Sequence, residues 1–175
     1  MAEEDGANDA AASQQDNKQQ FAIRKIYMRD MSFESPNAPA VFQGEWRPQV
    51  SVDLDTRVSR HGEDTYETIL RVTVTAKQED QTAYVAEVEQ AGLFVISGFD
   101  AKTLDALLGS YCPAQLFPFA REAIADMVAK GGFPQMMLAP VNFEAMYMQQ
   151  RRQKQEAQAG DGDSDTEADS GQEAR

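Results

Sequence analysis

Two aspartates, one histidine and one cysteine are the side chains whose types and spacing could support catalysis. Asp53 and Asp55 are two residues apart on a predicted strand, so their carboxylates would share one face, as an acid/base pair requires. The alternation of that strand favours instead two carboxylates on a solvated sheet face. His61, the only histidine, lies in a polar turn, and no base is spaced to activate Cys112. We therefore predict an exposed His61, a buried structural Cys112 and no enzymatic activity.

Metal and phosphate sites lack their required residues as well. One Cys and one His cannot form a Cys/His zinc site. The acidic segment 161–166 resembles the start of a calcium loop, but Thr166 and Gln172 stand where that loop needs Gly and Glu. Gly131 and Gly132 are not followed by the Lys-Ser/Thr of a phosphate loop. We expect neither a metal nor a cofactor.

The acidity of the chain is concentrated at its two ends. The 175 residues carry a formal charge of −13, but residues 1–20 hold five acids and one lysine, and residues 156–175 hold seven acids and one arginine. The segment between them is left with only −3. Both ends are rich in Ala, Gln, Gly, Asp and Ser and have too little apolar surface to fold. We predict disordered acidic tails at 1–20 and 156–175 around one domain at 21–155.

Composition also restricts compartment and partners. A single cysteine fits a reducing compartment. No basic-then-apolar leader precedes Phe21, and no apolar run approaches the ~18–20 residues that span a bilayer. Binding to nucleic acid depends on Lys and Arg, which the acidic balance opposes. We expect a cytoplasmic protein without direct membrane insertion and without a nucleic-acid partner.

The first half of the chain has the two-residue period of strands. Strands are predicted from Phe21, over 46–59, over 66–76 and over 82–90, with Gly92 interrupting the last and residues 93–96 apolar throughout. The first strand carries apolar and charged residues on both faces, which suggests a strand at a subunit boundary. Pro36 and Pro39 should end it.

The second half has helical periodicity. Asp100 is predicted to cap a short helix that Gly109 ends, and a second helix should run from Pro113 to Lys130. A last helix is expected from Asn142 to about Gln155. Strands followed by helices indicate an α+β fold, with a four-stranded antiparallel sheet and the helices packed on one face. Pairing of an edge strand with a second copy would remove an exposed edge, so we expect an oligomer.

Apolar side chains in the predicted links are the most informative functional feature. They are Phe33, Phe42, Trp46, Phe133, Met136 and Met137. Methionine adapts to varied partners, and a contiguous exposed patch of such residues usually marks an interaction site. For any single residue, covering the core beneath a loop is an equally good interpretation. The apolar connector 133–140 as a whole favours an interaction site.

Several motifs in one order resemble a known family. They are SFESPNAPAVF at 32–42, LRVTVTA at 70–76, YCP at 111–113, LFPFARE at 116–122, GFPQ at 132–135 and LAPVNF at 138–143. Over residues 21–150 the chain resembles the bacterial export chaperone SecB. The resemblance implies a homotetramer, a dimer of dimers, that holds unfolded secretory precursor proteins without ATP and delivers them to the translocation ATPase SecA.

The resemblance also implies where the partners bind. Asp30, Glu34, Val85 and Glu87 match the positions that dock the zinc-bearing basic tail of SecA on the flat sheet face. Asp30 and Glu34 independently share one side of the first strand by alternation. A client groove is expected at Phe42, Trp46, Val50, Val52, Leu54, Tyr111, Phe133, Met136, Met137 and Phe143. An oligomer that binds a small molecule or lipid in the same groove remains the alternative.

Overall fold

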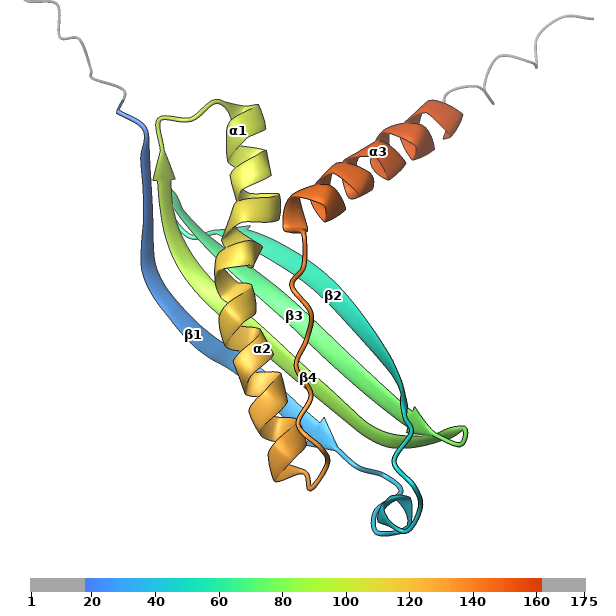
Figure 1. The fold of residues 1–175 in the computed structure, drawn as a ribbon. Helices are drawn as coiled ribbons and strands as arrows, with labels where there is room; N and C mark the ends of the chain where they lie inside the picture. The colour runs from blue at the N-terminus through green and yellow to red at the C-terminus, as the bar shows by residue number, and fades with distance from the viewer. Residues whose placement is uncertain (1–17, 162–175) are drawn as a thin grey trace, which may run out of the picture.

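The computed structural model describes residues 18–161, with side chains through residue 157 (Figure 1). The strands are β1 (Gln20–Glu34), β2 (Gln49–Arg60), β3 (Thr65–Gln78) and β4 (Gln81–Ser97), with a 3₁₀ turn (Ala40–Phe42) after β1. The helical segments are α1 (Ala101–Ala106), a π-helical segment (Leu107–Tyr111), α2 (Cys112–Lys130) and α3 (Phe143–Asp161). All strand pairs are antiparallel in the order β1-β4-β3-β2. The α+β prediction is confirmed.

The mixed alternation of β1 comes from two β-bulges. The pairing of β1 with β4 shifts between Ile23 and Lys25 and again between Met28 and Asp30. Each extra residue reverses which alternate side chains face the core. The partly buried residues that pack on the core are accordingly Phe21, Ile26 and Phe33, which no single alternation connects.

The last strand passes through Gly92 without interruption, so the predicted break there is wrong. A Cβ at Gly92 would lie 2.8 Å from the Phe94 ring and 2.9 Å from Leu116 Cδ2. Glycine at this point lets β4 pass close beneath α2. A tight hairpin joins β3 to β4 at Glu79 and Asp80, both of which have positive φ, as such turns require.

Residues 101–130 form one continuous helix rather than two, because Gly109 does not end the first. It lies in the π-helical segment that joins α1 to α2. Asp100 caps the start, as predicted, by accepting a hydrogen bond from the Thr103 N–H at 2.9 Å. Gly131 follows the last helical residue, and its N–H donates to the Met127 carbonyl at 2.8 Å. A Cβ at Gly109 would lie 2.5 Å from the Tyr147 ring, so this glycine admits α3 instead.

The sheet has one covered and one open face. We call the face that carries α2 the helix face and the opposite one the open face. The core lies under α2, where Leu70, Val72 and Val74 of β3 meet Leu116 and Ile124, all fully buried. Contacts of α2 are mainly with β4 and β3, which leaves the helix face of β2 largely without a helix above it (Figure 1).

Residues 133–142 connect α2 to α3 and run in front of the helix face, between α2 and β2 (Figure 1). Phe133 and Leu138 are buried in the core, so this link packs against the domain at these two residues. Asn142 caps α3 by accepting from the Ala145 N–H at 2.9 Å. The helix continues to Asp161, beyond the predicted end at Gln155 and into the segment assigned to the acidic tail. Residues 1–17 and 162–175, with the rest of both predicted tails and most of the calcium-like segment, lie outside the described residues.

Candidate functional site: an acidic open face and an apolar helix face

The four residues matched to partner docking lie together on the open face. Glu34 pairs directly with Val85 across β1 and β4, Glu87 pairs with Ser32, and Asp30 pairs with Glu89. Directly paired residues of antiparallel strands point to the same side, so Asp30, Glu34, Val85 and Glu87 form one cluster. The carboxylates of Asp30 and Glu34 are exposed, and the Glu87 side chain is one-third exposed. We call these four residues the acidic patch.

Two further glutamates on the open face are buried in ion pairs. Arg29 Nη1 lies 3.2 Å from Glu67 Oε1, and Arg71 Nη2 donates to Glu89 Oε1 at 2.7 Å. Arg57 also donates to Glu89. Glu67 and Glu89 retain only 9% and 11% of their side-chain exposure, because the long arginine side chains cover them. This network links all four strands.

Three further side chains, those of Tyr27, Ser59 and His61, contact the Glu67 carboxylate. Tyr27 donates its hydroxyl to Glu67 Oε1, and Ser59 donates to Oε2 at 3.1 Å. His61 Nε2 lies 3.2 Å from the same Oε2. The hydrogen bond from Tyr27 is the main cause that holds the pKa of Glu67 below its usual range. For Glu89, the hydrogen bond from Arg71 is the main cause of a lowered pKa. Both carboxylates are therefore ionised at neutral pH.

An aromatic cluster forms one end of the helix face. Phe133 is at its centre, with ring centroids 4.9 Å from Phe42, 5.1 Å from Trp46 and 4.9 Å from Tyr84. The Tyr84 hydroxyl donates to the sulfur of Met136 at 3.5 Å. Phe133 is only 5% exposed, whereas Phe42 is 49% exposed. The cluster presents Phe42 to solvent and supports it with buried rings.

Beside this cluster, β2 presents an apolar stripe on the helix face. Val50, Val52 and Leu54 pair with the buried Ala76, Val74 and Val72, so they point to the helix face. Val50 and Val52 are nevertheless 44% and 43% exposed, since α2 packs elsewhere. Met137 in the connector is 64% exposed. We call Phe42, Val50, Val52 and Met137 the exposed apolar surface.

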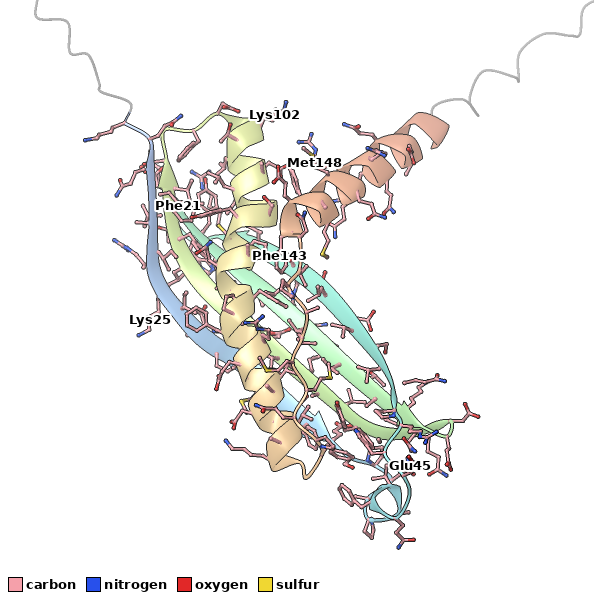
Figure 2. All side chains as sticks on the ribbon, in the orientation of Figure 1. Phe21, Lys25, Glu45, Lys102, Phe143 and Met148 are labelled. Carbon is pink, nitrogen blue, oxygen red and sulfur yellow. The ribbon has the colours of Figure 1, made fainter. Side chains whose placement is uncertain are left out.

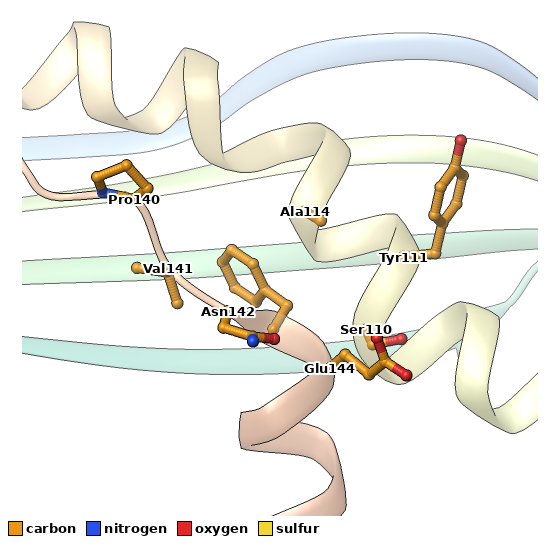
Figure 3. Close-up of a pocket in the computed structure, with 8 residues that line it drawn as sticks. Ser110, Tyr111, Ala114, Pro140, Val141, Asn142 and Glu144 are labelled. Carbon is orange, nitrogen blue, oxygen red and sulfur yellow. The ribbon is translucent and has the colours of Figure 1, made fainter.

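Tyr111 and Phe143 line a hollow of about 520 Å³ at the other end (Figure 3). It lies between the π-helical segment with the start of α2 and residues 140–144 of the connector and α3. Phe143 is the first residue of α3 and is 6% exposed (Figure 2). Its ring centroid lies 5.6 Å from that of Phe117 in α2. Tyr111 is exposed and packs edge-on against Phe21 at 5.0 Å. The ten predicted groove residues thus divide between the aromatic end, the β2 stripe and this hollow, and Phe133 and Phe143 are the two that the chain itself buries.

The aspartates, the histidine and the cysteine considered for catalysis lie in three different parts of the fold. Asp53 and Asp55 are exposed on the open face of β2, as predicted for solvated carboxylates. His61 is exposed in the turn but contacts Glu67, which the sequence did not indicate. Cys112 is fully buried, and burial raises the pKa of its thiol to about 12.

Among residues 18–161 no group of three or more Cys, His, Asp or Glu could hold a metal ion, and no helix is long and apolar enough to cross a membrane.

A family model described as preprotein translocase subunit SecB matches residues 14–154. This chain belongs to the SecB family. A protein-export protein SecB from Halorhodospira halophila is 53% identical, over 87% of this chain and 88% of its own length. The SecB of Methylococcus capsulatus is 55% identical, over 76% of this chain and 86% of its own.

A solved structure of the SecB type shares the architecture. The SecB-like chaperone of Mycobacterium tuberculosis, in complex with an antitoxin peptide, superposes with a TM-score of 0.58 over 69% of this chain and 90% of that chain. Its sequence identity is 18%, so this likeness concerns the fold. Family membership makes the chain a SecB export chaperone by descent, and the two faces of its sheet become the candidate surfaces for the partners of such a protein.

Proposed function

We propose that this chain is an ATP-independent holdase, which binds unfolded precursor proteins on the helix face and delivers them to SecA through the acidic patch. The observation that carries the proposal is the separation of two surfaces in a SecB-family chain. Phe42, Val50, Val52 and Met137 are exposed on or beside the helix face. Asp30, Glu34 and Glu87 lie on the open face. One subunit therefore offers separate surfaces for a client and for a delivery partner.

The client surface suits unfolded chains. Extended apolar segments that a native protein buries would cover Val50, Val52 and Met137, and burial of apolar area is favourable and insensitive to exact sequence. The exposed Met137 has an unbranched thioether that adapts to different side chains. Capture would then depend on how long a precursor stays unfolded, because a fast-folding protein hides the segments first.

The acidic patch suits a basic partner. Among the residues with described side chains, Asp30 and Glu34 enter none of the ion pairs, so their charges are available. Val85 lies directly beside Glu34 and adds an apolar contact between the carboxylates. Attraction to a basic segment of SecA would weaken as salt screens these exposed charges.

The assembly we propose is a homotetramer, a dimer of dimers. In the isolated chain β1 is an edge strand of the sheet. Exposed edges promote pairing with another strand, and self-pairing by a two-fold axis would close this one. Native mass spectrometry at micromolar concentration should give four chains per particle.

The delivery role is tested by reversing two charges. Asp30→Lys with Glu34→Lys should abolish binding of purified SecA, measured by calorimetry at moderate salt, and should spare capture of a reduced, unfolded precursor. Glu63→Lys with Asp64→Lys is the control, because it makes the same charge change at two exposed acids that enter none of the ion pairs between described side chains. SecA binding that survives the first pair, or loss of both activities together, would refute the division of surfaces.

The holdase role is tested by the wild-type protein alone. It should form a complex with the unfolded precursor and none with the same precursor after folding. Absence of a complex at moderate salt would show that the holdase proposal is wrong. A defined apolar ligand that copurifies at one per subunit would instead support the small-molecule or lipid-binding alternative.

A further inference from the structure

The carboxylates of the open face differ in what holds them. Glu89 is nearly buried and accepts from Arg71 Nε at 3.0 Å and Nη2 at 2.7 Å. Asp30 and Glu34 are exposed. Glu87 is intermediate: its Oε2 accepts a hydrogen bond from Thr73 Oγ1 at 2.7 Å, and its Oε1 lies 3.9 Å from Arg71 Nε. It is the one acid of the patch that a neutral hydroxyl orients.

We propose that Thr73 is a positioning residue for partner docking, because its hydroxyl fixes the carboxylate of Glu87 in the orientation that a basic partner meets. This inference rests on the proposed docking of SecA at the acidic patch. Thr73 of β3 is paired directly with Glu87 of β4, so both side chains point to the open face. Thr73 itself is partly buried and has no place in the acidic patch.

A neutral hydroxyl such as that of Thr73 can order the Glu87 side chain and leave its negative charge unchanged. A glutamate side chain loses considerable rotamer freedom when a partner immobilises it. Threonine is branched at Cβ and has few χ1 rotamers on a strand, so its hydroxyl points in a defined direction. The hydrogen bond orders Glu87 before the partner arrives and leaves its negative charge in place. A lysine or arginine at position 73 would neutralise that charge.

The neighbouring arginine does not replace the hydroxyl. Arg71 Nε and Nη2 both donate hydrogen bonds to Glu89 Oε1, at 3.0 and 2.7 Å. The distance from Arg71 Nε to Glu87 Oε1 is 3.9 Å, which is too long for a hydrogen bond. The guanidinium is therefore largely committed to Glu89. Glu87 keeps one oxygen, Oε1, without a hydrogen bond from a described residue, and this atom is available for a cation of the partner.

The test uses four variants of the full-length protein and purified SecA, with affinity measured by calorimetry at one fixed salt concentration. The variants are Thr73→Val, Thr73→Ser, Glu87→Gln and the double variant Thr73→Val with Glu87→Gln. Valine has the shape of threonine without the hydroxyl, and serine restores the hydroxyl. Thr73→Val should weaken SecA binding about fivefold, the equivalent of ordering one side chain. Thr73→Ser should lie close to wild type.

The double variant separates positioning from a general structural effect. If Thr73 acts through Glu87, adding Thr73→Val to Glu87→Gln should weaken binding no further. Capture of an unfolded precursor and the urea midpoint should be unchanged in all four variants, which a merely structural role of Thr73 would not predict.

The outcomes distinguish this inference from the proposed function. If Glu87→Gln weakens SecA binding and Thr73→Val does not, positioning by Thr73 is refuted and the acidic patch stands. If Thr73→Val weakens SecA binding by the same factor in the wild-type and in the Glu87→Gln protein, the hydroxyl does not act through Glu87 and the inference is also refuted. If Glu87→Gln has no effect, the docking role of Glu87 fails and the positioning role fails with it.

Discussion

Replacing Gly109 by alanine should detach the start of α3 while leaving the long helix intact. An alanine Cβ at this position would lie 2.5 Å from Tyr147 Cδ2 and 2.8 Å from Cε2. Tyr147 is 9% exposed, and its hydroxyl donates to Asp105 Oδ2 at 2.5 Å while it accepts from Arg151 at 3.1 Å. The clash therefore falls on the residue that holds α3 against α1.

The substitution has two effects of opposite sign on stability, and only the second changes the docking equilibrium of α3. Alanine in place of glycine inside a helix stabilises that helix by about 1 kcal/mol, whether or not α3 is docked. Overpacking costs about 1–3 kcal/mol and applies only while Tyr147 is docked. The docked state should lose about 1.4 kcal/mol relative to the undocked one, which corresponds to about a tenfold shift in the docking equilibrium. The free energy of global unfolding should change little.

Hydrogen exchange measures this shift locally. In the Gly109→Ala variant, amides in the first turns of α3, from Met146 onward, should exchange about tenfold faster, whereas amides of α2 should not. Gly44→Ala is the matched control, since nothing lies within 4 Å of the added Cβ, and it should leave α3 unchanged. Unaltered exchange in α3 of the Gly109→Ala variant would refute the reasoning that glycine is required there for helix approach.

Three further predictions follow from the buried groups and the exposed apolar surface. Because the pKa values of Glu67 and Glu89 are lowered in the fold, their stabilisation is complete above about pH 5 and is lost as pH falls below about 4. The urea midpoint should therefore drop at pH 3.5, and drop less with both residues changed to Gln; equal drops would contradict this. Burial should protect Cys112 from iodoacetamide at pH 8 until urea unfolds the protein, and rapid labelling of the native state would disprove it. Val50→Ser with Val52→Ser should weaken client capture about tenfold at an unchanged urea midpoint, and full capture would exclude these residues from the client surface.

The fold was predictable from the sequence where a strand keeps its two-residue alternation of apolar and polar side chains from end to end. Strands β2 and β3 keep strict alternation, and the solvated face predicted for Asp53 and Asp55 is confirmed, since both are exposed while Val52 pairs with the buried Val74 on the other face. The two bulges of β1 were not predictable, because an extra residue changes the phase of the pattern without a distinctive residue type. Glycine was misread twice for one reason: at Gly92 and Gly109 it admits a neighbouring element, and that neighbour is remote in sequence.

The site was predictable only in part. Alternation placed Asp30 and Glu34 on one side, but their proximity to Val85 and Glu87 depends on the β1–β4 register, which follows from tertiary structure. The arginine network was missed because Arg29 is the extra residue of the β1 bulge between Met28 and Asp30, where the alternation of the strand is broken. Arg57 and Arg71 could have been found, since both lie on the regular strands β2 and β3 and alternate with residues that point to the helix face.

The placement of the exposed apolar surface and the acidic patch on opposite faces has a thermodynamic consequence. A sheet is a single layer of backbone, so ligands on its two faces do not compete for space, and each binding constant should be independent of the other unless the sheet itself deforms. Arrival of a partner would then not displace a client. A ternary complex should accumulate, and release of the client would need a separate event with its own free energy.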